Sequence, residues 1–241
     1  MFTQSFKKHL LLPAALIILI AATFAFAQQS ATKHNVRPDS STAAPAASSK
    51  TKTSYSYEFT QPDFFVKRIL IEHDADGRGK INFEKKNEET AVVESLAISA
   101  VALSRIEALW ESLRFLDSQE DYQSSRQFPH LGTMRFKMER ETRKREVEWN
   151  WTNNKDASAL ATEYRRISDQ AILVFDIQVA RESQPLNAPK LMEQFEGMLK
   201  RNDLSDATQL IPLLKELSTD EHVPLIARNH ALRILKKIEK Q

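Results

Sequence analysis

Cysteine is absent from this chain of 241 residues. Its absence excludes a disulfide scaffold, a thiol nucleophile, an iron–sulfur cluster and any thiolate zinc site. The fold must therefore be stabilised by the burial of apolar side chains. Hydrophobic residues make up 41% of the chain, so the part after residue 54 can form one domain or two small ones without covalent cross-links.

Glycine is nearly as scarce, and its four residues stand at positions 77, 79, 132 and 197. This inventory excludes a P-loop, a dinucleotide-binding fingerprint and a G-x-S-x-G nucleophile elbow. No histidine belongs to an H-E-x-x-H motif, and His222 and His230 lie two helical turns apart, too far for one metal on a straight helix. We therefore expect no cofactor. A metal-dependent or hydrolytic enzyme that uses His73 or His130 stays open as an alternative.

A strong excess of positive charge is also missing. The formal net charge is +2, and Lys7 and Lys8 account for it. The rest of the chain is neutral, so it lacks the dense cationic field on which nucleic-acid binding depends. We expect no nucleic-acid partner.

The first 27 residues have the pattern of an export signal. Lys7 and Lys8 precede an apolar run, and Ala25 and Ala27 give the small-x-small pattern that signal peptidase requires before Gln28. Cleavage between Ala27 and Gln28 predicts a periplasmic or secreted protein with no stable membrane insertion. An uncleaved signal that anchors the protein is the alternative, because the apolar run approaches the roughly 17–25 residues of a membrane span.

Residues 28–54 differ in composition from everything that follows. They are rich in Ser, Thr, Ala, Pro and Lys and contain almost no large apolar side chain. Such a segment cannot bury enough surface to offset the entropy of ordering. We predict a disordered linker.

Residues 55–183 contain both the apolar–polar alternation typical of strands and the apolar spacing of three and four residues typical of helices. Apolar and polar residues alternate near Tyr55 and again in three later runs, which predicts strands over about 55–59, 65–71, 80–84 and 90–98. Ser99 is placed to cap a helix with one apolar stripe. A hairpin with Met134 on one strand and Val147 on the other follows, and then a long helix from Asp156 to about Glu182. This order predicts an α+β domain, an antiparallel sheet with two helices on one face. In that order the domain also looks like small uncharacterised bacterial secreted domains.

Residues 187–241 are helical throughout by pattern. Asn187 and Ser205 can cap the first two helices, and a third is expected over about 223–240. Residues 205–239 resemble a single HEAT-type repeat, although Pro224 and Leu225 replace the Val-Arg pair of that family. The resemblance implies a protein-binding scaffold. The positions that carry the resemblance are Pro212, the turn at 218–221, Ala227, Ala231, Leu232 and Leu235.

The segment from Asp74 to Lys85 is similar to the calcium loop of an EF-hand. Asp74, Asp76 and Asn82 occupy liganding positions, but Arg78 and Lys85 place cations where calcium requires oxygen ligands. The flanks also have strand patterns. We therefore predict a hairpin turn and no calcium site.

Three further candidates for a functional site are His73, the pair Trp149 and Trp151, and the aromatic loop between residues 122 and 132. We expect His73 to lie in a solvated turn, and we expect Trp149 and Trp151 to pack in the core on one strand face. An exposed tryptophan pair that stacks on a glycan or a peptide is the alternative. The loop from Tyr122 to Gly132 either closes the sheet edge or carries a binding site.

The last helix has one packed and one cationic side by pattern. We place Ala227, Ala231, Leu232, Leu235 and Ile238 on the packed side. A protein-interaction module without enzymatic activity, acting on a partner in the cell envelope, is the function we expect; a glycan- or peptide-binding protein is the alternative. The candidate interaction surface consists of His230, Arg233, Lys236, Lys237 and Lys240.

Overall fold

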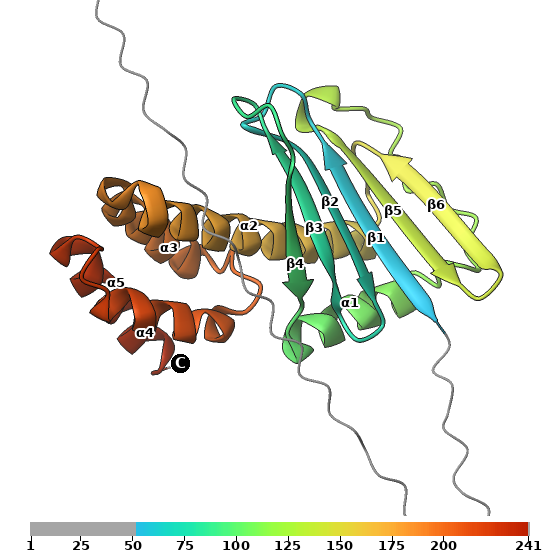
Figure 1. The fold of residues 1–241 in the computed structure, drawn as a ribbon. Coiled ribbons are helices and arrows are strands. Elements are labelled where there is room, and N and C mark those ends of the chain that lie inside the picture. Colours follow the sequence, from blue (N-terminus) through green and yellow to red (C-terminus); the bar gives the residue numbers. More distant parts are fainter. Residues whose placement is uncertain (1–51, 241) are drawn as a thin grey trace, which may run out of the picture. The chain divides into compact units, whose positions relative to one another are not determined.

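A six-stranded antiparallel sheet forms the centre of the computed structural model, which describes residues 52–240 (Figure 1). The strand order is β4-β3-β2-β1-β5-β6, so β4 and β6 are the edges. The α+β class predicted from the sequence is confirmed. The strands are β1 (Thr53–Thr60), β2 (Val66–Asp74), β3 (Arg78–Lys85), β4 (Val92–Ala97), β5 (Thr133–Arg140) and β6 (Arg143–Trp149).

The expected signal peptide, its cleavage site between Ala27 and Gln28, and the expected linker up to residue 51 lie outside the described residues. β1 begins at Thr53, two residues before Tyr55, where the sequence predicts that regular structure starts. Among the described residues, no helix combines the length and the apolar composition that a membrane span requires.

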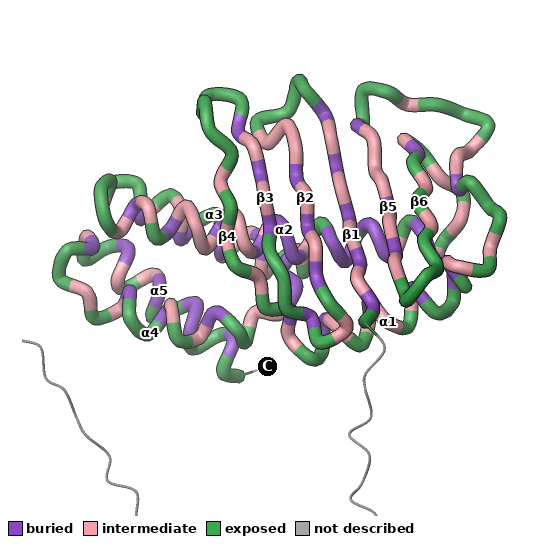
Figure 2. Tube along the Cα trace, turned by 45° about the vertical axis from the view of Figure 1, so that its right-hand side comes forward, coloured by how far each residue is buried: buried purple, intermediate pink, exposed green. Residues whose placement is uncertain are grey.

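The two faces of the sheet differ in chemistry. Along β1 each buried residue is followed by a less buried one (Figure 2), as expected of a strand whose successive side chains point to opposite faces. The buried side chains of Tyr55, Tyr57 and Phe59 point to the helices. The other face carries charged side chains paired across strands, among them Arg68 and Glu58 at 2.7 Å.

Two helices cover the apolar face, α1 (Ala100–Ser112) and α2 (Lys155–Ser183) (Figure 1). The Ser99 hydroxyl caps α1 as predicted, accepting a hydrogen bond from the Ala102 N–H at 3.2 Å. Asn154 caps α2. The rings of Tyr57 on β1 and Tyr164 on α2 stack with their centroids 5.1 Å apart, which fixes α2 to the middle of the sheet.

The remaining helices pack on the second half of α2. Leu173 and Ile177 of α2 share one buried cluster with Phe195, Leu214 and Ile234 from the C-terminal helices. Thus α2 belongs to both hydrophobic cores. The predicted helical segment is present as α3 (Ala188–Arg201), α4 (Ile211–Thr219) and α5 (Leu225–Ile238), with short 3₁₀ helices η1 (Pro129–Leu131), η2 (Pro185–Asn187) and η3 (Ala207–Leu210).

Two expected helix caps are wrong. Ser205 caps nothing; the Asp206 carboxylate accepts the Thr208 N–H at 3.0 Å, because the chain winds as η3 before α4 begins. Asn187 precedes α3 but its side chain makes no cap hydrogen bond, because Asn187 already has a helical backbone conformation and Pro189, which has no N–H, stands in the first turn.

One predicted packing position on α5 is also wrong. Leu232 is 40% exposed, whereas Ile234 is buried. Leu232 lies about 100° around the helix from the buried Ala231, and the buried stripe continues through residues 234, 235 and 238.

Candidate functional site

A cleft of about 420 Å³ opens on the helix-bearing side of the sheet, beside α2. Three side chains from separate loops form its mouth: Phe64, Leu131 and Trp151, which are 44%, 38% and 42% exposed. Arg165 and Asp169 of α2 form its polar rim. We call these five residues and the space between them the aromatic cleft. Its floor is made by sheet side chains, Tyr57, Phe59, Val66, Ile69 and Met134.

The two candidate tryptophans are separated by the end of β6. Trp149 is the last residue of the strand and is 2% exposed, and its ring packs edge to face with that of Phe136, with the centroids 4.5 Å apart. Trp151 lies beyond the strand, so alternation no longer directs it inward, and its ring meets that of Phe128 at 5.2 Å. The prediction of a core position is confirmed for Trp149 and wrong for Trp151.

The loop from Tyr122 to Gly132 is fixed to the sheet at both of its ends. The Ser124 N–H donates to the Trp151 carbonyl at 2.8 Å, and the Asn150 N–H donates to Gln123 Oε1 at 3.0 Å. Gln61 Nε2 donates to the backbone carbonyls of Pro129 and His130 at 3.1 and 2.7 Å. The loop therefore forms a wall of the aromatic cleft that is hydrogen-bonded to its neighbours at both ends. Its first residue, Tyr122, is buried with its ring against that of Trp149, and Leu131 near its other end lines the aromatic cleft.

Gly132 ends this wall in a backbone conformation that other residues rarely adopt, with φ +92° and ψ 176°. A Cβ atom there would lie 2.6 Å from the Phe59 ring. Only glycine lets the loop approach β1 so closely, and that approach places Leu131 at the mouth of the cleft.

Asp169 is the acidic residue of the aromatic cleft, beside the basic Arg165. It forms no hydrogen bond and no ion pair with any other described residue. Burial raises the pKa of its carboxyl to about 6, although the Arg165 guanidinium one turn earlier lowers it and Asp203 adds to the rise. The carboxylate is free to accept a hydrogen bond from a ligand.

His73 is buried, so the expectation of a solvated turn is wrong. It lies in β2 and alternates inward with Ile69 and Ile71. Its Nδ1–H donates to the Asp74 carbonyl at 2.7 Å, its Nε2 accepts from the Tyr164 hydroxyl at 2.8 Å, and the Trp110 indole N–H donates to the same hydroxyl at 3.0 Å. Burial lowers the pKa of His73. A neutral imidazole with both nitrogens engaged is a structural element of the core.

His130 lies on the surface in η1, where its ring lies 6.1 Å from that of Phe128 between centroids. No acidic or nucleophilic side chain among the described residues bonds to it. In the same part of the chain, no three His, Cys, Asp or Glu side chains gather where they could hold a metal ion.

The EF-hand-like segment forms the predicted hairpin turn between β2 and β3. The Asp74 carboxylate accepts the N–H groups of Asp76 and Arg78, each at 2.9 Å, and so caps the turn. Asn82 lies further along β3, and Lys85 pairs with Asp176 on α2. Strands flank the turn where an EF-hand has helices.

The expected cationic surface of α5 is divided. Arg233, Lys236, Lys237 and Lys240 are exposed, as predicted, whereas His230 is partly buried. Lys237 and His230 also bind Glu196 of α3, the latter at 3.1 Å, and these contacts lower the pKa of Glu196 to about 2, chiefly through Lys237. Two of the five residues of the expected surface therefore join α3 to α5.

The comparisons offer no relative from which a role could be transferred. No protein-family model matches the chain, and no curated protein matches it.

Three residues of the aromatic cleft were missed from the sequence. Phe64 follows Pro62, a turn signal that could have placed it outside the strands. Arg165 and Asp169 are charged residues one turn apart at the margin of an apolar stripe, a pattern that also describes an ordinary solvated helix face.

Proposed function

We propose that this protein is an exported, non-enzymatic module that binds a partner polypeptide in the cell envelope by taking one bulky apolar side chain of the partner into the aromatic cleft. A preformed cleft with three exposed apolar residues at its mouth and an unbonded carboxylate at its rim carries this proposal. The signal-like pattern of residues 1–27 supports export.

The dimensions and chemistry of the cleft favour a peptide. A volume of about 420 Å³ is at the lower end of the range for ligand pockets, about 300–1,000 Å³, and suits a single large side chain. Binding such a group would remove apolar surface of the floor around Phe59 and Ile69 from water, which is favourable. Asp169 and Arg165 can bind an N–H and a carbonyl of the peptide backbone beside it.

A glycan fits less well. Stacking on a sugar requires an open aromatic face with several hydrogen-bonding groups around it, whereas Trp151 meets Phe128 nearly edge to face. Hydrolysis is supported less, because no second catalytic group contacts His130 among the described residues.

Selection from a random peptide display library, with the full-length protein as bait, tests the proposal. We expect the selected peptides to contain Trp, Phe or Leu at one fixed position. Trp151→Ala should weaken their binding at least tenfold, because it removes one wall. The matched control is Val101→Ala, which truncates a 63% exposed apolar residue on α1.

Tryptophan fluorescence gives an independent readout. Trp110 and Trp149 are each 2% exposed, so a blue shift of emission on binding a selected peptide that carries Phe or Leu and no Trp reports Trp151. Equal affinity of the wild-type protein and Trp151→Ala for every selected peptide would exclude the cleft as the binding site.

A further inference from the structure

β4 is an edge strand, and the ladder to β3 defines which of its backbone groups face outward. The Ile98 N–H donates to the Gly77 carbonyl at 2.9 Å, which marks a hydrogen-bonded position of this antiparallel ladder. Because such positions alternate, the register of β3 with β4 directs the backbone groups of Val92, Glu94 and Leu96 to β3. Those of residues 93, 95 and 97 face away from the sheet.

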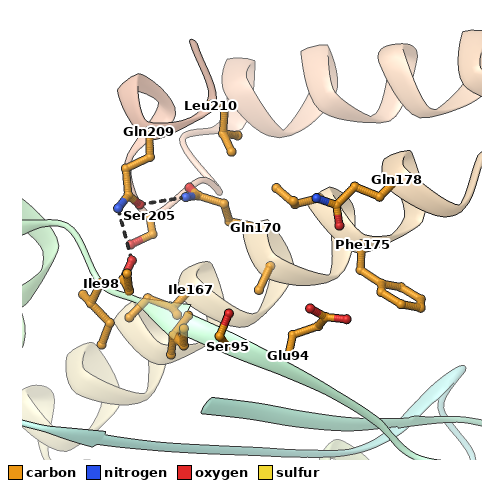
Figure 3. Close-up of a pocket in the computed structure, with 14 residues that line it drawn as sticks. Glu94, Ser95, Ile98, Ile167, Gln170, Phe175, Gln178, Ser205, Gln209 and Leu210 are labelled. Carbon is orange, nitrogen blue, oxygen red and sulfur yellow. Dashed lines mark hydrogen bonds between the residues drawn. The ribbon is translucent and has the colours of Figure 1, made fainter. Parts of the chain in front are cut away.

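A chain of hydrogen bonds through two glutamine side chains, which we call the amide relay, confirms that the Ala97 carbonyl faces outward. The relay also closes the open edge of β4 at its C-terminal end. Gln209 Nε2 donates to the Ala97 carbonyl at 3.2 Å, and Gln170 Nε2 donates to Gln209 Oε1 at 3.1 Å (Figure 3). Gln170 Oε1 in turn accepts the Asp206 N–H at 3.0 Å. The relay leaves the outward backbone groups of residues 93 and 95 as the open part of the edge.

A cavity of about 300 Å³ lies beside this open edge, between β4 and α2. Figure 3 shows Glu94 on the β4 side of the cavity and Phe175 and Gln178 on the α2 side. Glu94 forms no hydrogen bond or ion pair with another described residue. Lys85, the one buried lysine or arginine among the described residues, is paired with Asp176.

We propose that β4 binds an extended segment of a partner protein by strand addition, with a Lys or Arg side chain of that segment entering the cavity toward Glu94. The outward backbone groups of residues 93 and 95 supply the main-chain hydrogen bonds. The aliphatic stem of the basic residue packs on Phe175, and its charge meets the Glu94 carboxylate. This surface is separate from the aromatic cleft and does not depend on the function proposed for it.

A second copy of this chain fits the edge poorly. Antiparallel pairing of β4 with itself about a two-fold axis would bring the two Glu94 side chains to opposite or diagonal positions on one face of the sheet. Like charges at such positions are destabilising. The unpaired acidic side chain therefore favours a basic partner of different sequence.

The first test uses a fluorescent nine-residue peptide of alternating Thr and Val with a central Lys, titrated with the full-length protein. Ser95→Pro removes an N–H that faces outward, so the ladder to β3 stays intact, as for proline on natural edge strands. We expect Ser95→Pro to weaken peptide binding at least tenfold and Ser95→Ala to bind like the wild type. Wild-type affinity of Ser95→Pro would overturn the proposal.

The second test exchanges charges and does not require a proline. The wild type should bind the peptide with central Lys at least fivefold more tightly than one with central Glu, and Glu94→Lys should reverse that order. An unchanged preference would overturn the proposal, as would a concentration-dependent dimer in sedimentation that Ser95→Pro abolishes. Trp151→Ala should leave binding of this peptide unaffected, so failure here is distinguishable from failure of the cleft.

Discussion

Gly132 and Gly197 should respond in opposite ways to substitution by alanine. Gly132→Ala should destabilise the fold by about 1–3 kcal/mol, because a side chain strains that backbone conformation and meets the Phe59 ring. Gly197 lies within α3, where the nearest atom to an added Cβ is the flexible end of Arg201. Gly197→Ala should therefore stabilise by about 0.5–1 kcal/mol.

Urea denaturation of both glycine variants checks this pair. Opposite shifts of the unfolding midpoint are expected. A Gly132→Ala protein as stable as the wild type would mean that the cleft wall is not held against β1 as described.

Asp169 predicts a pH dependence of stability. Its folded pKa of about 6 is above the ordinary value, so the folded state binds a proton more tightly than the unfolded state. Its contribution to the free energy of unfolding is therefore favourable below pH 4 and is lost as the pH rises through 6. Asp169→Asn, which carries no charge, should gain stability over the wild type with rising pH, by at most about 2–3 kcal/mol at pH 7.5.

Parallel urea titrations at pH 4.5 and pH 7.5 measure this difference. Arg165 and Asp203, the charged neighbours of the carboxyl, are unchanged in the comparison. A stability difference that does not vary with pH would show that Asp169 is as solvated as an ordinary surface carboxylate.

At the scale of elements, α5 offers two adjacent residues with opposite environments. Ala231 is fully buried against α3 and α4, while Leu232 is 40% exposed. Ala231→Asp should destabilise by about 3–5 kcal/mol by burying an unpaired charge. Leu232→Asp should change stability by no more than about 0.5 kcal/mol.

Thermal unfolding followed by circular dichroism separates the two variants. If both variants lost the same amount of stability, Leu232 would be packed, as the repeat-like sequence pattern predicts. In that case α5 would be rotated about its axis from its described position. The sequence pattern assigns Leu232 to the packed side because residues 231, 232 and 235 also fit one apolar stripe of a helix. The sequence does not show how α5 is rotated about its axis against the neighbouring helices.

At the scale of the whole molecule, the order of elements was predictable and the site was not. The alternation of buried residues in β1 and the apolar stripe of α2 are both local patterns in the sequence. Any antiparallel sheet covered by helices requires such patterns, so they predict the elements without knowledge of the tertiary contacts. The mouth of the aromatic cleft joins Phe64, Leu131 and Trp151, which come from three separate loops. No local pattern encodes which loops meet, and the turn of Trp151 to the surface depends on where β6 ends.

The position of β1 has a mechanical consequence. β1 begins at Thr53, one residue after the start of the described part of the chain, and it is an inner strand of the sheet. It pairs with β5 over Thr53–Thr60 and with β2 over Ser54–Thr60. A pulling force applied at Thr53 would therefore act on an inner strand. Both hydrogen-bonded ladders would share that load and be sheared together, whereas an edge strand such as β4 can be peeled away bond by bond. A force applied at the N-terminal end of β1 would thus load the fold where its backbone pairing is most extensive.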